Sequence, residues 1–263
     1  MLHLYRLALS IHVLAGITGL AAFWTPALAR KGGTTHVRVG RIFYNATCVV
    51  ALTGLAMAAM IAVAPTLGRP RILAAFLAYL VIITFAPVHH GVRVLETRRE
   101  PAKLRTPFHT MLNSTAIVAA LAMIALAFAL RRPVFAALSP IGLLVGRGNL
   151  RYARRPGATH MSWWYEHMGS MLGGGIAFHT AFLVIGAGRF LGAYFTGLYA
   201  VVPWVLPSII GIPATQIWIG YYRRKFERRD RDAGSGMRDA GSGMRDPIPG
   251  FKDLPIDRFA IRD

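Results

Sequence analysis

The sequence is poor in cysteine and in acidic residues. It contains one cysteine, Cys48, which lies inside an apolar run, and 11 Asp and Glu against 30 Lys and Arg. A single cysteine excludes an intramolecular disulfide and any metal site built from several cysteines. Ligands for a metal or a cofactor would therefore have to come from the nine histidines.

Charge of either sign is also scarce for a chain of this length. Charged residues make up 16% of the 263 residues and hydrophobic residues 54%, and the mean hydropathy is +0.45. This composition excludes an ordinary soluble domain and is typical of a polytopic membrane protein. Because lipid offers the backbone no other hydrogen-bond partner, each apolar run is predicted to be a helix. The runs cover residues 4–29, 42–64, 72–92, 108–130, 134–145, 164–188 and 199–222.

The fifth apolar run is the shortest. Arg132 and Arg147 bracket only 14 residues, which correspond to about 21 Å of helix at 1.5 Å per residue. The run predicts either a short membrane span or a re-entrant segment.

The basic residues decide between these alternatives. If all seven runs cross the membrane, one side collects 19 Lys and Arg and the other keeps six. The first set is Arg30, Lys31, Arg38, Arg41, Arg93, Arg98, Arg99, Lys103, Arg105, Arg147, Arg151, Arg154, Arg155, Arg223, Arg224, Lys225, Arg228, Arg229 and Arg231; the second is Arg6, Arg69, Arg71, Arg131, Arg132 and Arg189. Cytoplasmic loops carry an excess of Lys and Arg.

We therefore predict an all-α, polytopic bundle of seven transmembrane helices, with a short fifth helix. The N-terminus lies outside, the C-terminus lies inside, and the expected location is the inner membrane of a bacterium, with the first helix an uncleaved anchor. The formal net charge of +19 then reflects topology and attraction to anionic lipid, and not binding of nucleic acid.

Two regions differ in composition. Residues 1–222 form the predicted transmembrane helical domain, and residues 223–263 a cytoplasmic basic segment followed by a flexible tail. The tail repeats DAGSGMR in tandem over residues 232–245, which predicts a Gly/Ser-rich linker. Prolines and five large apolar residues follow it, so the end of the tail is a candidate docking motif for a partner.

Ionisable side chains within lipid are costly and are candidates for function. No Asp or Lys lies inside a predicted span, and Glu166 is the one carboxylate near a span. The lack of an intramembrane Lys excludes a retinal Schiff base. The lack of buried carboxylates argues against a cation-coupled transporter, and histidine remains.

Positions along the helices divide the histidines into two predicted layers. His12 and His179 share the outer layer, and His89, His90, His109 and His167 lie toward the cytoplasm. Two neutral imidazoles from different helices could hold a b-type haem. The candidate cofactor ligands are His12, His179, His167, His89 and His109, and the candidate metal ligands are His12, His179 and His167. Alternatively, these histidines hydrogen-bond between helices as packing contacts.

The segment WWYEHMGSMLGGG, residues 163–175, carries two further features. Glu166 could orient an imidazole, but neighbours on a helix diverge by about 100°, so its partner is predicted to be a histidine other than His167. Gly169 and Gly173 form a GxxxG pattern that predicts close helix packing and a central sixth helix.

Three segments together resemble a known family. They are IHVLAGITGL, ARKGGTTHVRVGRIFY and EHMGSMLGGGIAFHTAFLV. The chain resembles bacterial predicted membrane proteins grouped as domain of unknown function 2306. The matching residues are His12, Gly16, Pro26, His36, Gly40, Arg41, Tyr44, His167, Met168, Thr180, Ala181 and Phe182. The resemblance covers the membrane region and implies no activity.

Three functions stay open at this level. The first is a membrane protein that binds haem b and transfers electrons, with quinone as a possible partner. The second is a non-catalytic membrane subunit or small-molecule carrier whose tail docks a membrane or cytoplasmic protein. The third is a membrane-embedded metal hydrolase that uses the cytoplasmic histidines and Glu166.

Overall fold

The fold comes from a computed structural model that describes residues 1–156, 161–188 and 194–235. Within these residues the chain forms helices and no strand. The long helices are α1 (Leu2–Leu28), α2 (Thr34–Val63), α3 (Arg71–Glu96), α4 (Pro107–Leu130), α5 (Pro133–Ala153), α6 (Ser162–Ala181) and α8 (Val202–Ser235). Short 3₁₀ turns are η1 (Pro65–Leu67), η2 (Pro101–Leu104) and η4 (Gly197–Val201), and the π-helical turn η3 (Phe182–Gly186) follows α6.

Local sequence fixes several helix ends. Thr106 caps α4 by accepting a hydrogen bond from the backbone N–H of His109 at 3.2 Å, and Pro107 occupies the first turn, where its missing N–H costs nothing. Arg131 takes the left-handed conformation with φ 49° and ends α4. Pro133 then starts α5, so the two helices form a tight antiparallel pair.

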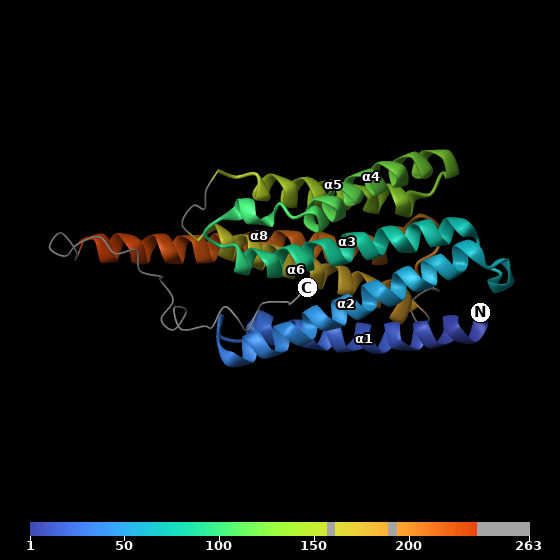
Figure 1. The fold of residues 1–263 in the computed structure, drawn as a ribbon, viewed down its shortest axis with the longest axis horizontal. Helices are drawn as coiled ribbons and strands as arrows, with labels where there is room; N and C mark the ends of the chain where they lie inside the picture. The colour runs from blue at the N-terminus through green and yellow to red at the C-terminus, as the bar shows by residue number, and fades with distance from the viewer. Residues whose placement is uncertain (157–160, 189–193, 236–263) are drawn as a thin grey trace.

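Consecutive long helices run in opposite directions along the bundle (Figure 1). The loops after α1, α3 and α5 therefore lie at one end, from which α8 also projects, whereas the N-terminus and the loops after α2 and α4 lie at the other end. The first end carries the loops that are rich in Lys and Arg, and we call it the basic end.

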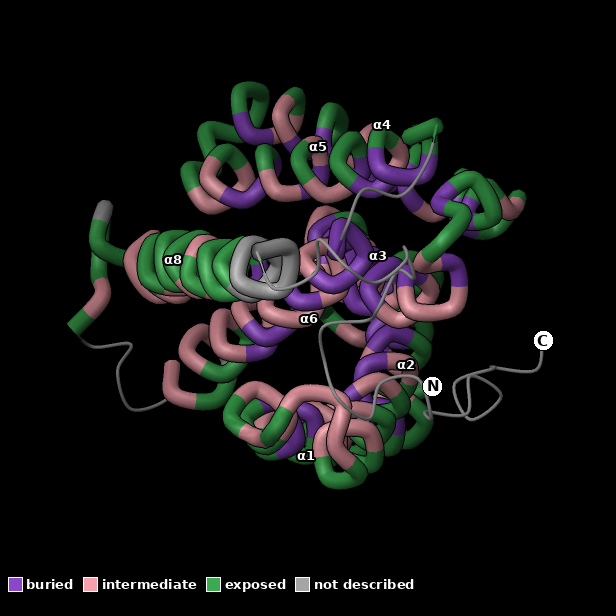
Figure 2. Tube along the Cα trace, turned by 90° about the vertical axis from the view of Figure 1, so that its left-hand side faces the viewer, coloured by how far each residue is buried: buried purple, intermediate pink, exposed green. Residues whose placement is uncertain are grey.

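The helices form three layers, seen along the bundle in Figure 2. The α1–α2 pair and the α4–α5 pair are the outer layers, and α3 and α6 pack against each other between them, with α8 against α6. Buried residues gather on α3, α2 and the inner faces of α4 and α5. Large apolar side chains such as Leu14, Leu52, Phe128 and Ile217 are exposed on the outside, as in a protein whose outer surface faces lipid.

The expected class of protein is confirmed at the coarse level: the bundle is all-helical in its described parts, and five of its helices are long and apolar enough to cross a membrane. These are α1, α2, α3, α4 and the segment Tyr199–Arg228. The helices α5 and α6 are not among these five. Arg147 and Arg151 lie in α5, and Glu166 and His167 in α6, which lowers the hydropathy of both.

The fifth helix is longer than its apolar run. The sequence predicts a short helix that ends near Arg147, but α5 continues for two further turns and has 21 residues, or about 31 Å. Its last turns remain helical because Tyr152 and Ala153 bury their side chains against the bundle. Hydropathy therefore underestimates the length of this helix.

The last helix also passes its predicted end. We place the domain boundary after residue 222, yet α8 continues through the basic segment to Ser235. Phe226 explains part of this extension, because it is 4% exposed and packs on Trp164 with a ring-centroid distance of 5.3 Å. The second DAGSGMR repeat and the proposed docking motif lie outside the described residues.

Candidate functional site

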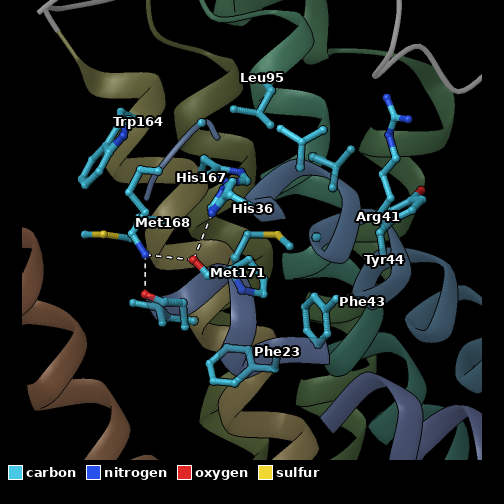
Figure 3. Close-up of a pocket in the computed structure, with 18 of the residues that line it drawn as sticks. Phe23, His36, Arg41, Phe43, Tyr44, Leu95, Trp164, His167, Met168 and Met171 are labelled. Carbon is cyan, nitrogen blue, oxygen red and sulfur yellow. Dashed lines mark hydrogen bonds between the residues drawn. The ribbon is translucent and has the colours of Figure 1, made fainter. Parts of the chain in front are cut away.

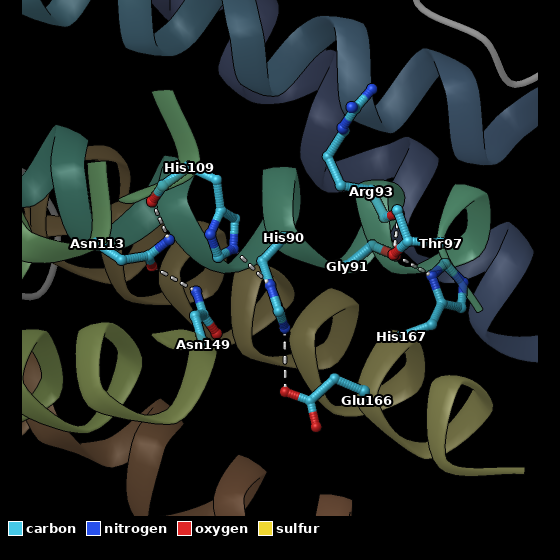
Figure 4. Close-up of polar contacts among 9 residues, drawn as sticks. All are labelled: His90, Gly91, Arg93, Thr97, His109, Asn113, Asn149, Glu166 and His167. Carbon is cyan, nitrogen blue, oxygen red and sulfur yellow. Dashed lines mark hydrogen bonds and ion pairs between the residues drawn. The ribbon is translucent and has the colours of Figure 1, made fainter. Parts of the chain in front are cut away.

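The α3–α6 interface positions most of the polar groups. A Cβ on Gly91 of α3 would lie 2.9 Å from the Cβ of Ser170 and 3.2 Å from the sulfur of Met171, so the two helices approach closely only because this residue is glycine. Two neighbouring contacts join the helices there (Figure 4). The Nδ1 of His167 lies 2.8 Å from the Gly91 carbonyl oxygen, and the Nε2 of His90 lies 3.1 Å from Oε1 of Glu166.

On one side of this interface lies a cavity of about 390 Å³ among α1, α2, α3 and α6, which we call the basic-end cavity (Figure 3). Its walls are mainly apolar, and aromatic rings and thioethers supply them. These residues are Phe23, Phe43, Trp163, Trp164, Met168, Met171 and Leu172. Such a lining with a few polar groups is typical of small-molecule sites.

Two histidines on different helices border the basic-end cavity side by side. The rings of His36 and His167 have centroids 6.4 Å apart. The Nδ1 of His36 lies 3.0 Å from the Pro26 carbonyl oxygen, and the Nδ1 of His167 bonds Gly91 in the same way. A carbonyl only accepts, so each Nδ1 carries the proton, and each neutral ring keeps its lone pair on Nε2. The backbone thus fixes both tautomers.

Cationic side chains of α2 and of the loops after α1 and α3 border the same cavity. Lys31, Arg41 and Arg98 are among its lining residues, together with Glu96. Lys31 lies between α1 and α2 and donates hydrogen bonds to the carbonyl oxygens of Pro26 and Ala27, which closes the end of α1. Burial lowers its pKa because the charged ammonium loses water. The cavity therefore combines an apolar body with a positively charged rim.

On the other side of the interface lies a buried hydrogen-bonded chain, which we call the His109–His90–Glu166 chain (Figure 4). His90 is fully buried and His109 is 2% exposed. The Nδ1 of His90 lies 3.0 Å from the Nε2 of His109, and its Nε2 contacts Glu166. Two amides support the chain, because Asn149 donates to Asn113 at 2.7 Å and Asn113 donates to the His109 carbonyl oxygen at 2.8 Å.

Glu166 connects this chain to a second, more open cavity. Its side chain is 25% exposed and borders a hollow lined by residues of α3, α5, α6 and α8. The prediction that Glu166 pairs with a histidine other than His167 is confirmed, since its partner is His90. Glu166 and His167 are neighbours on α6, and successive side chains on a helix diverge by about 100°. Glu166 therefore borders the second cavity and His167 borders the basic-end cavity.

The predicted outer pair, His12 and His179, is not brought together. The ring of His179 contacts Phe23 and Trp24, with centroid distances of 5.5 Å and 5.4 Å. These rings follow His12 by 11 and 12 residues, or about 16 to 18 Å along α1. Our placement was wrong because α6 ends at Ala181 and lies closer to the basic end than the midpoint of its apolar run indicates.

Both outer histidines instead make short-range contacts. The Nδ1 of His12 lies 3.0 Å from the hydroxyl of Thr53, and the Nδ1 of His179 lies 2.7 Å from the carbonyl oxygen of Gly175, one turn earlier. Phe23 fills the space beside Gly175 through which a flat macrocycle would have to approach the backbone of α6. These residues therefore do not fit a haem between His12 and His179.

The predicted inner candidates separate into three environments. His167 borders the basic-end cavity, and His109 belongs to the buried chain. His89 lies 3.2 Å from the hydroxyl of Tyr44 through its Nδ1 and stacks on Phe85. Among the described residues, no three His, Cys, Asp or Glu side chains converge as metal ligands, so neither the metal set His12, His179 and His167 nor a hydrolase centre has support in this geometry.

His36 and His90 are missing from the candidate ligands predicted from the sequence, but His36 borders the cavity and His90 is the centre of the buried chain. His90 continues the spacing of Tyr79, Ile83 and Ala86, whose burial is shown by the structure and not by the uniformly apolar sequence around them. His89 lies off this stripe.

The close packing predicted for Gly169 and Gly173 occurs one position away. A Cβ on Gly173 would meet no atom within 4 Å, and one on Gly169 would lie 3.6 Å from Ile219. The tight contacts are made by Gly174 against Val88 and by Gly175 against Phe23. The central position of α6 is nevertheless confirmed, because it packs on α1, α3 and α8.

Comparison with known proteins adds no functional information about this site. No family model, no curated protein and no solved structure matches the chain. The resemblance to domain of unknown function 2306 stays a prediction. The motif residues that carry it nevertheless share a location, because seven of them border the basic-end cavity: Pro26, His36, Gly40, Arg41, Tyr44, His167 and Met168.

Proposed function

We propose that this protein is an integral membrane protein that binds an amphipathic small molecule of the quinol or quinone class in the basic-end cavity. The observation that carries the proposal is the pair His36 and His167, whose Nδ1 atoms are held by backbone carbonyls at 3.0 Å and 2.8 Å beside an apolar cavity. This corresponds to the small-molecule carrier or subunit among the functions that the sequence leaves open.

The ligand class follows from the hydrogen-bonding groups. A neutral imidazole with its proton on Nδ1 presents an acceptor at Nε2, so each histidine favours a hydroxyl donor such as that of a quinol. Lys31, Arg41 and Arg98 on the rim supply donors for a carbonyl or anionic oxygen. The aromatic and thioether walls favour a flat apolar ring or an isoprenoid chain.

A cavity-filling substitution tests this proposal. Gly40 borders the cavity, and a Cβ there would meet no atom within 4 Å. Gly40→Leu therefore extends a side chain from an unobstructed Cβ at the cavity wall, and replacing a glycine within α2 favours the helix by about 1 kcal/mol or less. Gly16→Leu is the matched control, since a Cβ on Gly16 also meets nothing within 4 Å and Gly16 lies away from the cavity.

The measurement is quenching of tryptophan fluorescence in detergent by a short-chain ubiquinone analogue. Trp163 and Trp164 border the cavity, so wild type and Gly16→Leu should give saturable quenching, and Gly40→Leu should lose the saturable component. Equal saturable quenching in all three proteins, or none in wild type, would contradict binding in this cavity.

We further propose that the bundle crosses the inner membrane seven times, with the N-terminus outside and the basic end in the cytoplasm. The support is the alternation of helix directions, which gathers the loops after α1, α3 and α5 and the projecting part of α8 at one end. Cytoplasmic loops are enriched in Lys and Arg. Cys48→Ser provides a background without cysteine.

Single cysteines at Gly68 and at Ala102 in that background test the orientation. A membrane-impermeant maleimide added to intact cells should label Gly68→Cys in the loop after α2, and should label Ala102→Cys in η2 only after the membrane is opened. The reverse pattern, or labelling of both sites in intact cells, would contradict the proposed topology.

A further inference from the structure

The His109–His90–Glu166 chain has one open end. Beginning at Glu166, an ionised carboxylate only accepts, so His90 donates from Nε2. The Nδ1 of His90 then carries a lone pair and accepts from the Nε2 of His109. The Nδ1 of His109 is left with a lone pair, and this atom is buried without a hydrogen-bond partner among the described residues.

The charge of the chain is also unbalanced in this state. One carboxylate and two neutral imidazoles carry one negative charge in total. It lies on Glu166, whose side chain is 25% exposed, beside His90, which is fully buried, and His109, which is 2% exposed. Partial burial makes this charge more costly. One additional proton makes the three groups neutral together and replaces the lone pair on Nδ1 of His109 by an N–H.

We propose that the His109–His90–Glu166 chain is a proton relay that takes up one proton at Nδ1 of His109 and delivers one proton to Glu166 at the wall of the second cavity. A hydronium ion that reaches His109 supplies the proton: one of its O–H bonds breaks, a water molecule is left, and a new N–H bond forms at Nδ1. The Nε2–H bond of His109 breaks as its proton moves to Nδ1 of His90. The Nε2–H bond of His90 breaks as its proton moves to Oε1 of Glu166.

Each imidazole gains one N–H bond and loses one, no electron is transferred, and the carboxylate becomes a carboxylic acid. Because the side chain of Glu166 is 25% exposed, the proton can leave from there to water in the second cavity. The distances of 3.0 Å and 3.1 Å are hydrogen-bond distances across which such transfers occur.

Other titratable groups surround the relay from the neighbouring helices. His89 and Arg93 belong to α3, and Tyr152 of α5 packs edge-on against His90 with a centroid distance of 5.7 Å. Arg155 lies over the Tyr152 ring at 4.9 Å. Arg93 is paired with Glu96 on its own helix, and Arg105 donates to the carbonyl oxygen of Ala153. Glu166 is the acidic group at the end of the relay.

The relay predicts that His109 and Glu166 titrate as one unit. In full-length protein in detergent, ¹⁵N-histidine NMR reports the protonation of His109 Nδ1, and infrared difference spectroscopy reports the carboxylic acid of Glu166. As the pH is lowered, both signals should change with one shared midpoint. Glu166→Gln removes the negative charge and should weaken the proton affinity of His109 at least tenfold.

Two controls separate the relay from a simple structural brace. Glu100→Gln removes an exposed carboxylate that pairs with Lys103, and it should leave the midpoint of His109 unchanged. His90→Phe breaks the chain and should separate the two midpoints; if this variant does not fold, Glu166→Asp, which shortens the acid, should shift the midpoint of His109 instead. A bare Nδ1 on His109 across the whole range, or a midpoint unaffected by Glu166→Gln, would overturn the relay.

Discussion

Histidines beside the basic-end cavity and histidines away from it have different environments, although the sequence presents them in the same way. Away from the cavity, His12 and His179 each bond one group nearby, the hydroxyl of Thr53 and the carbonyl oxygen of Gly175. Toward the basic end, His36 and His167 border a cavity and His90 bonds two ionisable partners. The second group therefore combines histidines beside a cavity with a histidine that joins two ionisable side chains.

The difference teaches that residue type and depth do not identify a functional histidine in a membrane bundle. What separates His179 from His36 and His167 is the space beside the ring, because all three bond a backbone carbonyl oxygen through Nδ1. Aromatic side chains occupy that space beside His179, whereas a cavity of about 390 Å³ occupies it beside His36 and His167. Packing contacts between helices account for the outer pair.

The largest expected effect comes from separating α3 and α6 at the basic end. Gly91→Leu forces a side chain against Ser170 and Met171, and overpacking of this kind costs about 1 to 3 kcal/mol or more. It should lower the thermal unfolding midpoint strongly and abolish quinone-analogue binding. Gly173→Leu is the control, because a Cβ there meets nothing within 4 Å; an equal loss of stability in both variants would contradict the tight interface.

Removal of one amide beneath the buried chain should have the next largest effect. Asn149→Leu leaves the buried side-chain oxygen Oδ1 of Asn113 without its donor, at a cost of about 1 to 3 kcal/mol. The double variant Asn113→Leu with Asn149→Leu removes both polar groups. In chemical denaturation it should be less destabilised than the sum of the two single variants, and simple additivity would show that the amides do not interact.

The smallest effect is expected at the outer pair. Thr53→Val removes the acceptor of His12 while keeping the shape of the side chain, and an ordinary hydrogen bond contributes about 0.5 to 1.5 kcal/mol. We expect a small decrease of the unfolding midpoint and unchanged binding of the quinone analogue. A loss of binding in this variant would show that the outer histidines belong to the site.

The sequence predicts the helices well, because hydropathy depends on composition alone. The apolar run 72–92 corresponds to α3 (Arg71–Glu96), and the run 108–130 to α4 (Pro107–Leu130). The run 134–145 predicts too short a helix for α5. The later turns of α5 are buried by contacts with other helices, which hydropathy does not register.

The site is harder to predict, because it depends on how each helix is rotated and offset along its axis. In α3 nearly every position is apolar, so the pattern alone does not separate the buried His90 from the neighbouring His89. The pairing of His90 with Glu166 joins residues 76 positions apart. The sequence singles out Glu166 only because charged residues within membrane helices are rare.

The most direct test of the difference between the two groups compares two histidines of one helix. His167 and His179 both lie on α6, and the Nδ1 of each bonds a backbone carbonyl oxygen, at 2.8 Å and 2.7 Å. Of these two, His167 borders the basic-end cavity. The measurement is the dissociation constant of the reduced quinol form of the analogue, whose hydroxyls can donate to Nε2, from its displacement of the quenching ubiquinone analogue in wild type, His167→Ala and His179→Ala.

We expect His167→Ala to weaken binding about tenfold or more, which corresponds to about 1.4 kcal/mol, and His179→Ala to change it less than twofold. Equal dissociation constants for the two variants, or a larger effect from His179→Ala, would contradict the assignment of the binding site to the basic end.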